Sequence, residues 1–283
     1  MQGRILLFCL AVIVGCAESP EPTPGKPDQQ RAPLAQEFDA ATTGTIEGRV
    51  VWEGDVLVAK ETVERIIAYN PKLHLNPARF TTPHFPIVNA KNRGVVGVVV
   101  FIKDMEPRRS KPWDHAKVRV EFHERRLLAQ QGDVGFVRRG DSVEIANRDK
   151  EYHLLRARGA AFFAMPLSGS DKIHQRVLAE SGVVDLTCAA GYYWLHAHLF
   201  VTEHPYFVRT DSDGRFVIDQ VPSGEYEVVC WLPNWRVERV ERDPEVADVA
   251  RWIWAAPRTQ TKRIVVESGT KGEMNYTWNN QEN

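Results

Sequence analysis

Beyond residue 43, apolar residues recur in short runs rich in Val, Ile, Phe and Tyr, which turns containing Gly, Asn, Asp or Pro separate. Several runs alternate with polar residues, for example 117–122 and 142–146. Alternation of this kind gives a strand one face for a core and one for solvent. We expect one helix, at 243–254, because this segment begins with Asp-Pro-Glu, as capped helices often do. The pattern predicts an all-β body of about 240 residues, enough for two modest domains or one large sandwich.

The N-terminus has the pattern of an export signal. Arg4 precedes an apolar run at 5–14, which has the length of a signal-peptide core and is too short to span a bilayer. The run ends in Ile13-Val14-Gly15-Cys16, which resembles the lipobox of bacterial lipoproteins. We therefore expect residues 1–16 to be a lipoprotein signal peptide, with lipid on Cys16. The alternative is an ordinary secretory signal in which Cys16 is incidental, and both interpretations export the protein.

Composition extends this picture of an envelope protein. Residues 17–43 are rich in Pro, Glu, Gln and Ala, which predicts a disordered tether. The formal net charge of −1 gives no basic surface for nucleic acid. We expect localisation in the bacterial cell envelope, with a membrane contact through Cys16 and an unknown protein or glycan partner. Ala17 lacks the aspartate that often marks inner-membrane retention, which favours the outer membrane over a periplasm-facing inner-membrane anchor.

The segment 206–231 has strand, Asp-Gly turn, strand, Pro-Ser-Gly turn and strand in succession, which predicts a three-stranded meander. It resembles the carboxypeptidase regulatory-like family, whose members show T-D-x-x-G-x-F followed by P-x-G-x-Y. That family also has a G-x-V-x-x-x-G signature in its first strand, and this chain has one far upstream, from Gly48 to Gly54. The resemblance implies a transthyretin-like β sandwich interrupted by an insertion.

The intervening segment resembles a cupredoxin-like domain of the plastocyanin or methylamine-utilisation type. The matching segments are 137–153, 185–188 and 204–207. The resemblance implies an organisation in which 44–93 begins the regulatory-like domain, 94–204 is a cupredoxin-like Greek-key sandwich, and 205–283 completes the first domain and the C-terminal tail.

The cupredoxin resemblance implies a copper site that this chain has partly lost. His153 and Cys188 occupy the family's first-histidine and cysteine positions. The loop after Cys188 is one residue longer than in the family, with Gly191 or Tyr192 in place of the second histidine and Leu195 in place of the methionine. A blue-copper site needs a thiolate with two imidazoles, so the missing loop histidine weakens the site more than the missing methionine.

Two further histidines, His196 and His198, follow this loop, and a strand would place both on one face beside Trp194. They complete a candidate ligand set with His153 and Cys188 if the loop folds back. We expect a metal-free scaffold that acts as a non-catalytic binding or structural module. The alternative is a periplasmic copper protein for electron transfer or copper handling.

Other candidate residues have a structural interpretation. The histidines that lack ligand-like spacing are His74, His84, His115, His123 and His174. Cys188 and Cys230 are either a disulfide or two buried thiols. Two or more exposed tryptophans on one face would indicate a carbohydrate-binding module, whereas we expect them to pack in cores. No nucleophile-base pair, paired carboxylates or phosphate-binding loop is evident, and we expect no enzyme activity.

Overall fold

The computed structural model describes residues 37–280 except positions 57, 68–76 and 131. The predicted signal peptide, Cys16 and most of the tether lie outside the described residues. The prediction of an all-β chain is confirmed, because the described residues form strands and two short 3-10 helices, η1 (Ala40–Thr42) and η2 (Pro107–Arg109). No helix in this part of the chain is long and apolar enough to cross a membrane.

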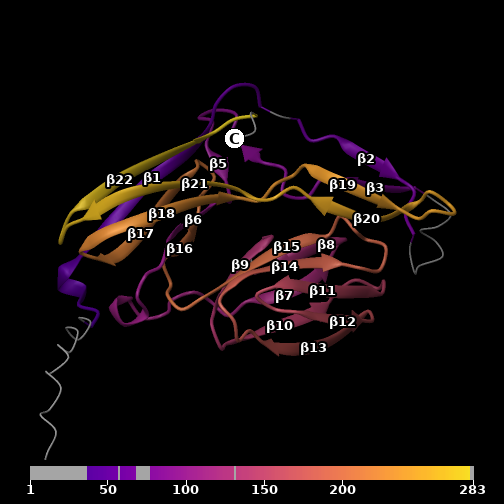
Figure 1. Cartoon of the computed structure of the whole chain (residues 1–283), viewed down its shortest axis with the longest axis horizontal. Helices are drawn as coiled ribbons and strands as arrows, with labels where there is room; N and C mark the ends of the chain where they lie inside the picture. Colours follow the sequence, from indigo (N-terminus) through magenta and orange to yellow (C-terminus); the bar gives the residue numbers. More distant parts are fainter. Residues whose placement is uncertain (1–36, 57, 68–76, 131, 281–283) are drawn as a thin grey trace, which may run out of the picture. The chain divides into compact units, whose positions relative to one another are not determined.

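The first β sandwich, sandwich 1, consists of a three-stranded sheet with order β17-β1-β22 and a four-stranded sheet with order β16-β6-β18-β21. Its core lies between the two sheets and contains Trp52, Tyr276 and Trp278. Figure 1 labels its strands. They are β1 (Thr43–Trp52), β6 (Val99–Ile102), β16 (Phe207–Arg209), β17 (Arg215–Pro222), β18 (Gly224–Leu232), β21 (Arg258–Val266) and β22 (Lys271–Trp278).

The expected meander at 206–231 is wrong in its pairing, although its strands lie where the sequence predicts them. β16 and β18 both pair with β6, whereas β17 pairs with β1 in the other sheet. The turns therefore carry the chain from one sheet to the other instead of forming hairpins. The reason is that Phe216 on β17 and Val228 on β18 both face the core of sandwich 1, and two sheets that bury a common core must lie face to face.

The second sandwich, sandwich 2, is a continuous segment of the chain. A four-stranded sheet with order β13-β10-β7-β8 packs on a five-stranded sheet with order β12-β11-β14-β15-β9. The strands are β7 (Arg119–His123), β8 (Arg126–Ala129), β9 (Val134–Arg138), β10 (Ser142–Asn147), β11 (His153–Gly159), β12 (Phe163–Leu167), β13 (Ser170–Val177), β14 (Gly182–Cys188) and β15 (His196–Thr202).

The sequence predicts that the inserted domain begins at residue 94, whereas the strand pairing indicates a later start. β6, at 99–102, hydrogen-bonds to β16 and β18 of sandwich 1. Strand pairing thus places the first strand of sandwich 2 at β7. The apolar run of β6 is buried on both sides, because Val100 and Ile102 face the core of sandwich 1 and Val99 packs against Phe207 and Trp231 in a second apolar cluster.

Three two-stranded pairs complete the architecture. The first two, β2 (Glu61–Glu64) with β3 (Ala78–Thr81) and β19 (Val237–Arg242) with β20 (Val249–Trp254), contribute Phe80 and Trp252 to the core of sandwich 2. The third pairs β4 (Ile87–Val88) with β5 (Val95–Val96).

The helix expected at 243–254 is wrong. Asp243 accepts hydrogen bonds from the backbone N–H groups of Glu245 and Val246, as a helix cap does. The chain then reverses, because Ala247 has a φ of 59° and the N–H of Asp243 donates to the carbonyl of Asp248. Residues 249–254 form β20 instead, where Val249 and Trp252 are buried in the core of sandwich 2.

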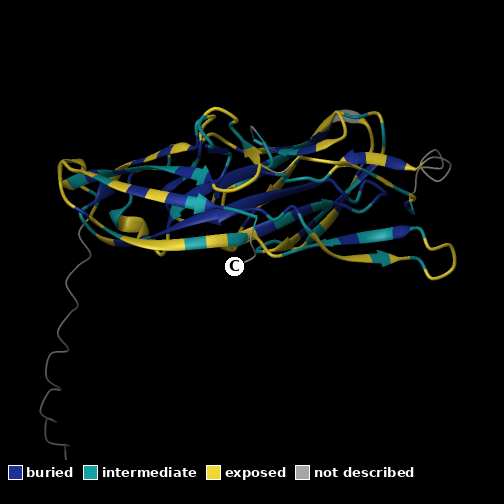
Figure 2. Cartoon of the chain, turned by 90° about the horizontal axis from the view of Figure 1, so that it is seen from above, coloured by how far each residue is buried: buried dark blue, intermediate teal, exposed yellow. Residues whose placement is uncertain are grey.

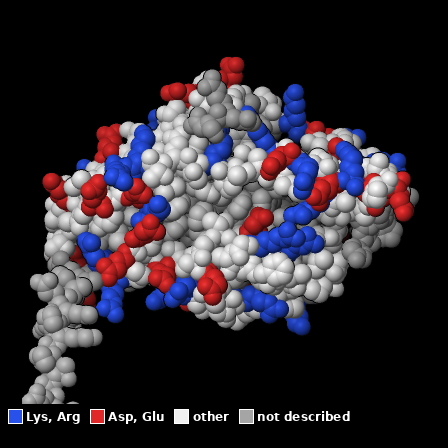
Figure 3. All heavy atoms as spheres, viewed as in Figure 1, with Lys and Arg blue, Asp and Glu red and all other residues white. Residues whose placement is uncertain are grey.

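Burial and charge follow the two-sandwich arrangement. In Figure 2 the central strands are mainly buried, and exposed residues gather at loops and strand ends. Acidic and basic side chains are interspersed over the face shown in Figure 3. This mixed surface agrees with the near-zero net charge of the sequence.

Candidate metal centre

Strand β15 supplies two of the three histidines of the candidate site. His196 and His198 are both buried, and their ring centroids lie 4.5 Å apart. The prediction that they share one face of a strand is confirmed. They lie beside Trp254 and Trp231 instead of Trp194. The intervening Ala197 faces the core of sandwich 2, so the two histidines are on the outward face of the sheet, where it packs against sandwich 1 and β20.

The third histidine, His84, comes from the turn between β3 and β4. Its side chain is fully buried, and its ring centroid lies 4.7 Å from that of His196 and 4.9 Å from that of His198. His84 has a φ of 57°, which is a left-handed conformation that few side-chain-bearing residues adopt. Strained backbone of this kind is frequent at functional sites. The sequence gives His84 no ligand-like spacing, and the fold brings its ring next to those of His196 and His198.

The three histidines have the geometry of a metal site. One ligand nitrogen from each lies within 4.8 Å of the other two, and this is the one such group of three or more potential ligands within the described parts of the chain. Each ring also carries a buried nitrogen without a hydrogen-bond partner, namely His84 Nε2, His196 Nδ1 and His198 Nδ1. A buried polar atom without a partner is costly. A metal ion bound by all three nitrogens would remove that cost.

Two aspartates orient the histidine rings. Asp133 Oδ2 lies 2.5 Å from His84 Nδ1, and Asp185 Oδ1 contacts His196 Nε2. A carboxylate accepts the proton of the nitrogen it contacts and leaves the lone pair of the other nitrogen free, which is the usual arrangement around metal-binding histidines. The contacts therefore leave free the same nitrogens of His84 and His196 that lack partners.

The electrostatic environment favours neutral rings. Burial lowers the pKa of His84 and lowers that of His198 well below its usual value. Burial opposes ionisation of Asp133, but its hydrogen bond with His84 and the nearby charge of Arg209 outweigh this effect and hold its pKa at about 2. The result is a pair of neutral imidazoles with an ionised carboxylate behind one of them.

The two predicted cupredoxin ligands, His153 and Cys188, lie together but elsewhere. Cys188 Sγ is 3.7 Å from His153 Nδ1, and His153 Nε2 is 3.1 Å from Asp149 Oδ2. Phe122 stacks on the His153 ring with a centroid distance of 4.2 Å, and the Tyr192 ring lies 4.9 Å away on the loop where the family has a histidine. Among the described residues, no third ligand joins this pair to form a metal-binding group.

The four predicted ligands therefore do not converge. Cys188 continues the inward series of Val184 and Leu186 on β14, whereas His196 pairs with the outward-facing Thr187. Successive residues of a strand point to opposite faces. The pair His153 and Cys188 thus lies inside sandwich 2, and the pair His196 and His198 lies on the other side of the same sheet.

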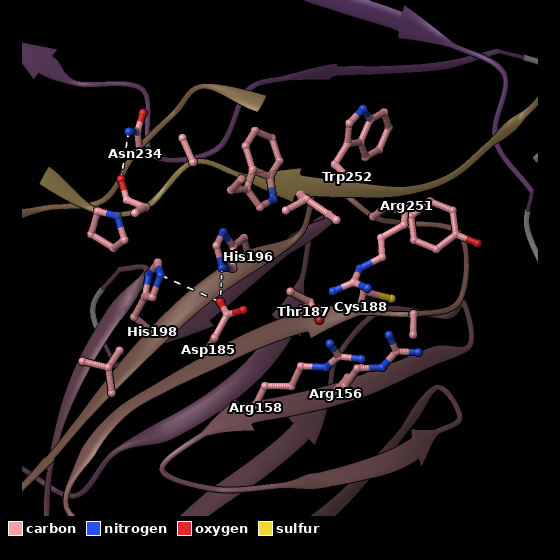
Figure 4. Close-up of a pocket in the computed structure, with 18 of the residues that line it drawn as sticks. Arg156, Arg158, Asp185, Thr187, Cys188, His196, His198, Asn234, Arg251 and Trp252 are labelled. Carbon is pink, nitrogen blue, oxygen red and sulfur yellow. Dashed lines mark hydrogen bonds and ion pairs between the residues drawn. The ribbon is translucent and has the colours of Figure 1, made fainter. Parts of the chain in front are cut away.

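The outward face of this sheet also borders a cavity of about 680 Å³ (Figure 4). His196, His198 and Asp185 lie at one part of the cavity, and Arg156, Arg158 and Arg251 line another. The segment 250–257, which contains most of β20, forms the opposite wall.

The remaining candidates are structural. Cys188 and Cys230 are free buried thiols that belong to the separate cores of sandwich 2 and sandwich 1. No tryptophan in the described part of the chain is exposed, so the condition for a carbohydrate-binding face is not met. The turn at 211–214 is a tight turn in which Gly214 N–H donates to the Asp211 carbonyl.

Comparisons with known proteins concern the fold of part of the chain. No protein-family model and no curated protein sequence matches the chain. A purple cupredoxin from Nitrosopumilus maritimus is similar in structure, with 18% identity, coverage of 31% of this chain and 99% of that one, and a TM-score of 0.25. A reduced mutant of amicyanin is similar with 16% identity, coverage of 36% and 97%, and a TM-score of 0.26. A copper-containing nitrite reductase from Thermus scotoductus SA-01 is similar with 16% identity, coverage of 32% and 24%, and a TM-score of 0.27.

Proposed function

We propose that this chain is an exported, lipid-anchored envelope protein that binds one divalent transition metal ion through His84, His196 and His198. The observation that carries the proposal is the convergence of three buried imidazoles, each with an unpaired nitrogen. Imidazole ligands suit zinc and copper(II), and three of them leave a position open on a four-coordinate metal ion.

The chemistry of the donor set distinguishes this site from a blue-copper centre. The three histidines include no thiolate, and the cupredoxin-type pair of His153 and Cys188 has an aromatic ring, Tyr192, where a further ligand is needed. The proposed role is therefore binding of a metal ion at a position other than the one that the cupredoxin resemblance implies. An electron-transfer role through Cys188 is the weaker candidate.

The experiment is a metal count on the purified full chain after loading with zinc or copper(II) and removal of unbound ions. The wild-type chain should retain about one ion. The double variant His84→Asn, His196→Ala should lower the affinity at least tenfold, because two imidazoles are lost. Asparagine is chosen at position 84 because it tolerates a positive φ.

His123→Ala is the matched control, because His123 is exposed at the end of β7 and remote in the fold from the site. Its metal content should equal that of the wild type. Equal retention by the double variant, or no retention by the wild type, would refute the proposal. Thermal unfolding of the metal-free variants checks that each one folds.

A further inference from the structure

The cavity beside the histidines has an unusual distribution of charge. Three arginines line it, and Asp185 is the single acidic side chain among its described lining residues. Asp185 is already engaged by His196. The lining therefore carries a net positive charge before any metal ion is counted.

Strand register places two of the arginines, Arg156 and Arg158, on the same face of one sheet as His196 and His198. Arg158 pairs with Asp185, and Asp185 pairs with His198. One step along the same face, Arg156 pairs with Thr187, and Thr187 pairs with His196. The arginines are thus two strands from the histidines, a backbone separation of about 10 Å, which their long side chains partly span.

The guanidinium groups have few partners among the described residues. Within the described parts of the chain, no side chain or backbone carbonyl bonds to Arg156 or Arg158, and Arg251 has a distant ion pair of 3.9 Å with Glu241. Burial, with repulsion from Arg158 and Arg251, lowers the pKa of Arg156. Like charges held close together are unfavourable, and a bound anion would relieve the repulsion.

Aromatic side chains supply the rest of the cavity surface. Tyr193 and Trp252 line the cavity together with the arginines, and Trp231 and Trp254 line it beside the histidines. A cavity with an apolar wall and a few placed charged groups is typical of small-molecule sites.

We propose that this cavity binds a small anion with oxygen donors, which the guanidinium groups of Arg156 and Arg158 hold beside the metal ion. This inference rests on the proposed function, because the metal ion at the histidines supplies the second positive centre. Arginine suits this task because its planar fork matches the geometry of carboxylate and phosphate oxygens. Two kinds of anion share these oxygen donors, namely an organic molecule with a carboxylate and inorganic phosphate.

The test is a calorimetric titration of the zinc-loaded full chain with benzoate and, separately, with inorganic phosphate. The wild type should bind at least one of the two probes. Tighter binding of benzoate would indicate an organic carboxylate as the ligand, and tighter binding of phosphate would indicate an inorganic anion. The variant Arg156→Gln, Arg158→Gln should bind that probe at least tenfold more weakly and keep the zinc content of the wild type. The variant Arg156→Lys, Arg158→Lys should recover part of the affinity, because lysine retains charge without the fork.

The outcomes separate this inference from the proposed function. If zinc binds and neither probe does, or if the glutamine variant binds the probe as tightly as the wild type, the anion site is wrong and the metal site stands. If zinc does not bind, the metal site is wrong whatever the probes do. Loading with cobalt(II) supplies a second readout, because an anion that reaches the metal ion changes its visible absorption bands and one held away from it does not.

Discussion

Cys188 and His196 lie on adjacent antiparallel strands of one sheet and point to opposite faces of it. Leu186 pairs with Ala197 toward the core of sandwich 2, and Thr187 pairs with His196 away from it. A shift of register by one residue would be needed to reverse either side chain, and it would expose the whole apolar face. The alternation of side chains between the two faces of the sheet thus separates the pair His153 and Cys188 from the three-histidine site.

This separation predicts the behaviour of a thiol variant. Cys188→Ser should leave the metal content unchanged, and the copper-loaded wild type should lack an intense thiolate charge-transfer band, because the proposed ligands are imidazoles. Visible spectroscopy and elemental analysis of both proteins check this. An intense band that disappears in the serine variant would show that copper binds at Cys188.

The aspartate behind His84 should tune metal affinity without touching the metal ion. Asp133→Asn removes the charge that accepts the His84 Nδ1 proton, and loss of such a partner typically lowers affinity about 10- to 100-fold. Competition with a chromophoric zinc chelator measures the change. Asp141→Asn is the control, because Asp141 is exposed on a turn of sandwich 2 and should have wild-type affinity. Equal affinity in both variants would contradict the role of Asp133.

Acid stability should depend on His204, which is not one of the three grouped histidines. Burial lowers the pKa of His204 from 6.5 to about 4, with a smaller opposing effect from Asp104. The unfolded chain therefore binds more protons than the folded chain between these values, and stability falls as the pH drops from 6.5 toward 4.

The variant His204→Phe retains a ring to stack on Phe207 and cannot be protonated. Relative to the wild type, it should lose roughly 2–3 kcal/mol less unfolding free energy between pH 7.5 and pH 4.5. Urea unfolding at the two pH values measures this difference. An identical loss in both proteins would show that His204 is not the group responsible.

Gly48 on β1 should be required for packing in sandwich 1. A Cβ at this position would lie 1.7 Å from the backbone oxygen of Met274 on the neighbouring parallel strand β22. Gly48→Ala must shift one of the strands, at a cost of roughly 1–3 kcal/mol typical of overpacking. Chemical denaturation measures the change, and an unaltered midpoint would contradict the close approach.

The sequence contains enough information for the strand content and for two of the three histidines of the candidate site. Alternation in runs such as 142–146 reflects burial on one face, and it predicts β10 directly. His196 and His198 are two residues apart on one strand, so their shared face also follows from local spacing. Single-strand signals of this kind are visible without tertiary contacts.

The remaining features depend on contacts between distant segments. His84 has no ligand-like spacing, because the turn that holds it meets β15 only in the folded chain. The cap-like hydrogen bonds of Asp243 suggest a helix, but burial of Val249 and Trp252 against sandwich 2 favours a strand. His84 stands out in one local respect, its positive φ, and this is a property of the structure and not of the sequence.

The most direct test of the central claim is X-ray absorption spectroscopy at the zinc edge of the loaded full chain. Zinc bound at the three histidines should show a first shell of nitrogen or oxygen neighbours at about 2.0 Å, with the outer scattering of imidazole rings and no sulfur. A sulfur neighbour at about 2.3 Å would place the metal ion at Cys188 and contradict the three-histidine site.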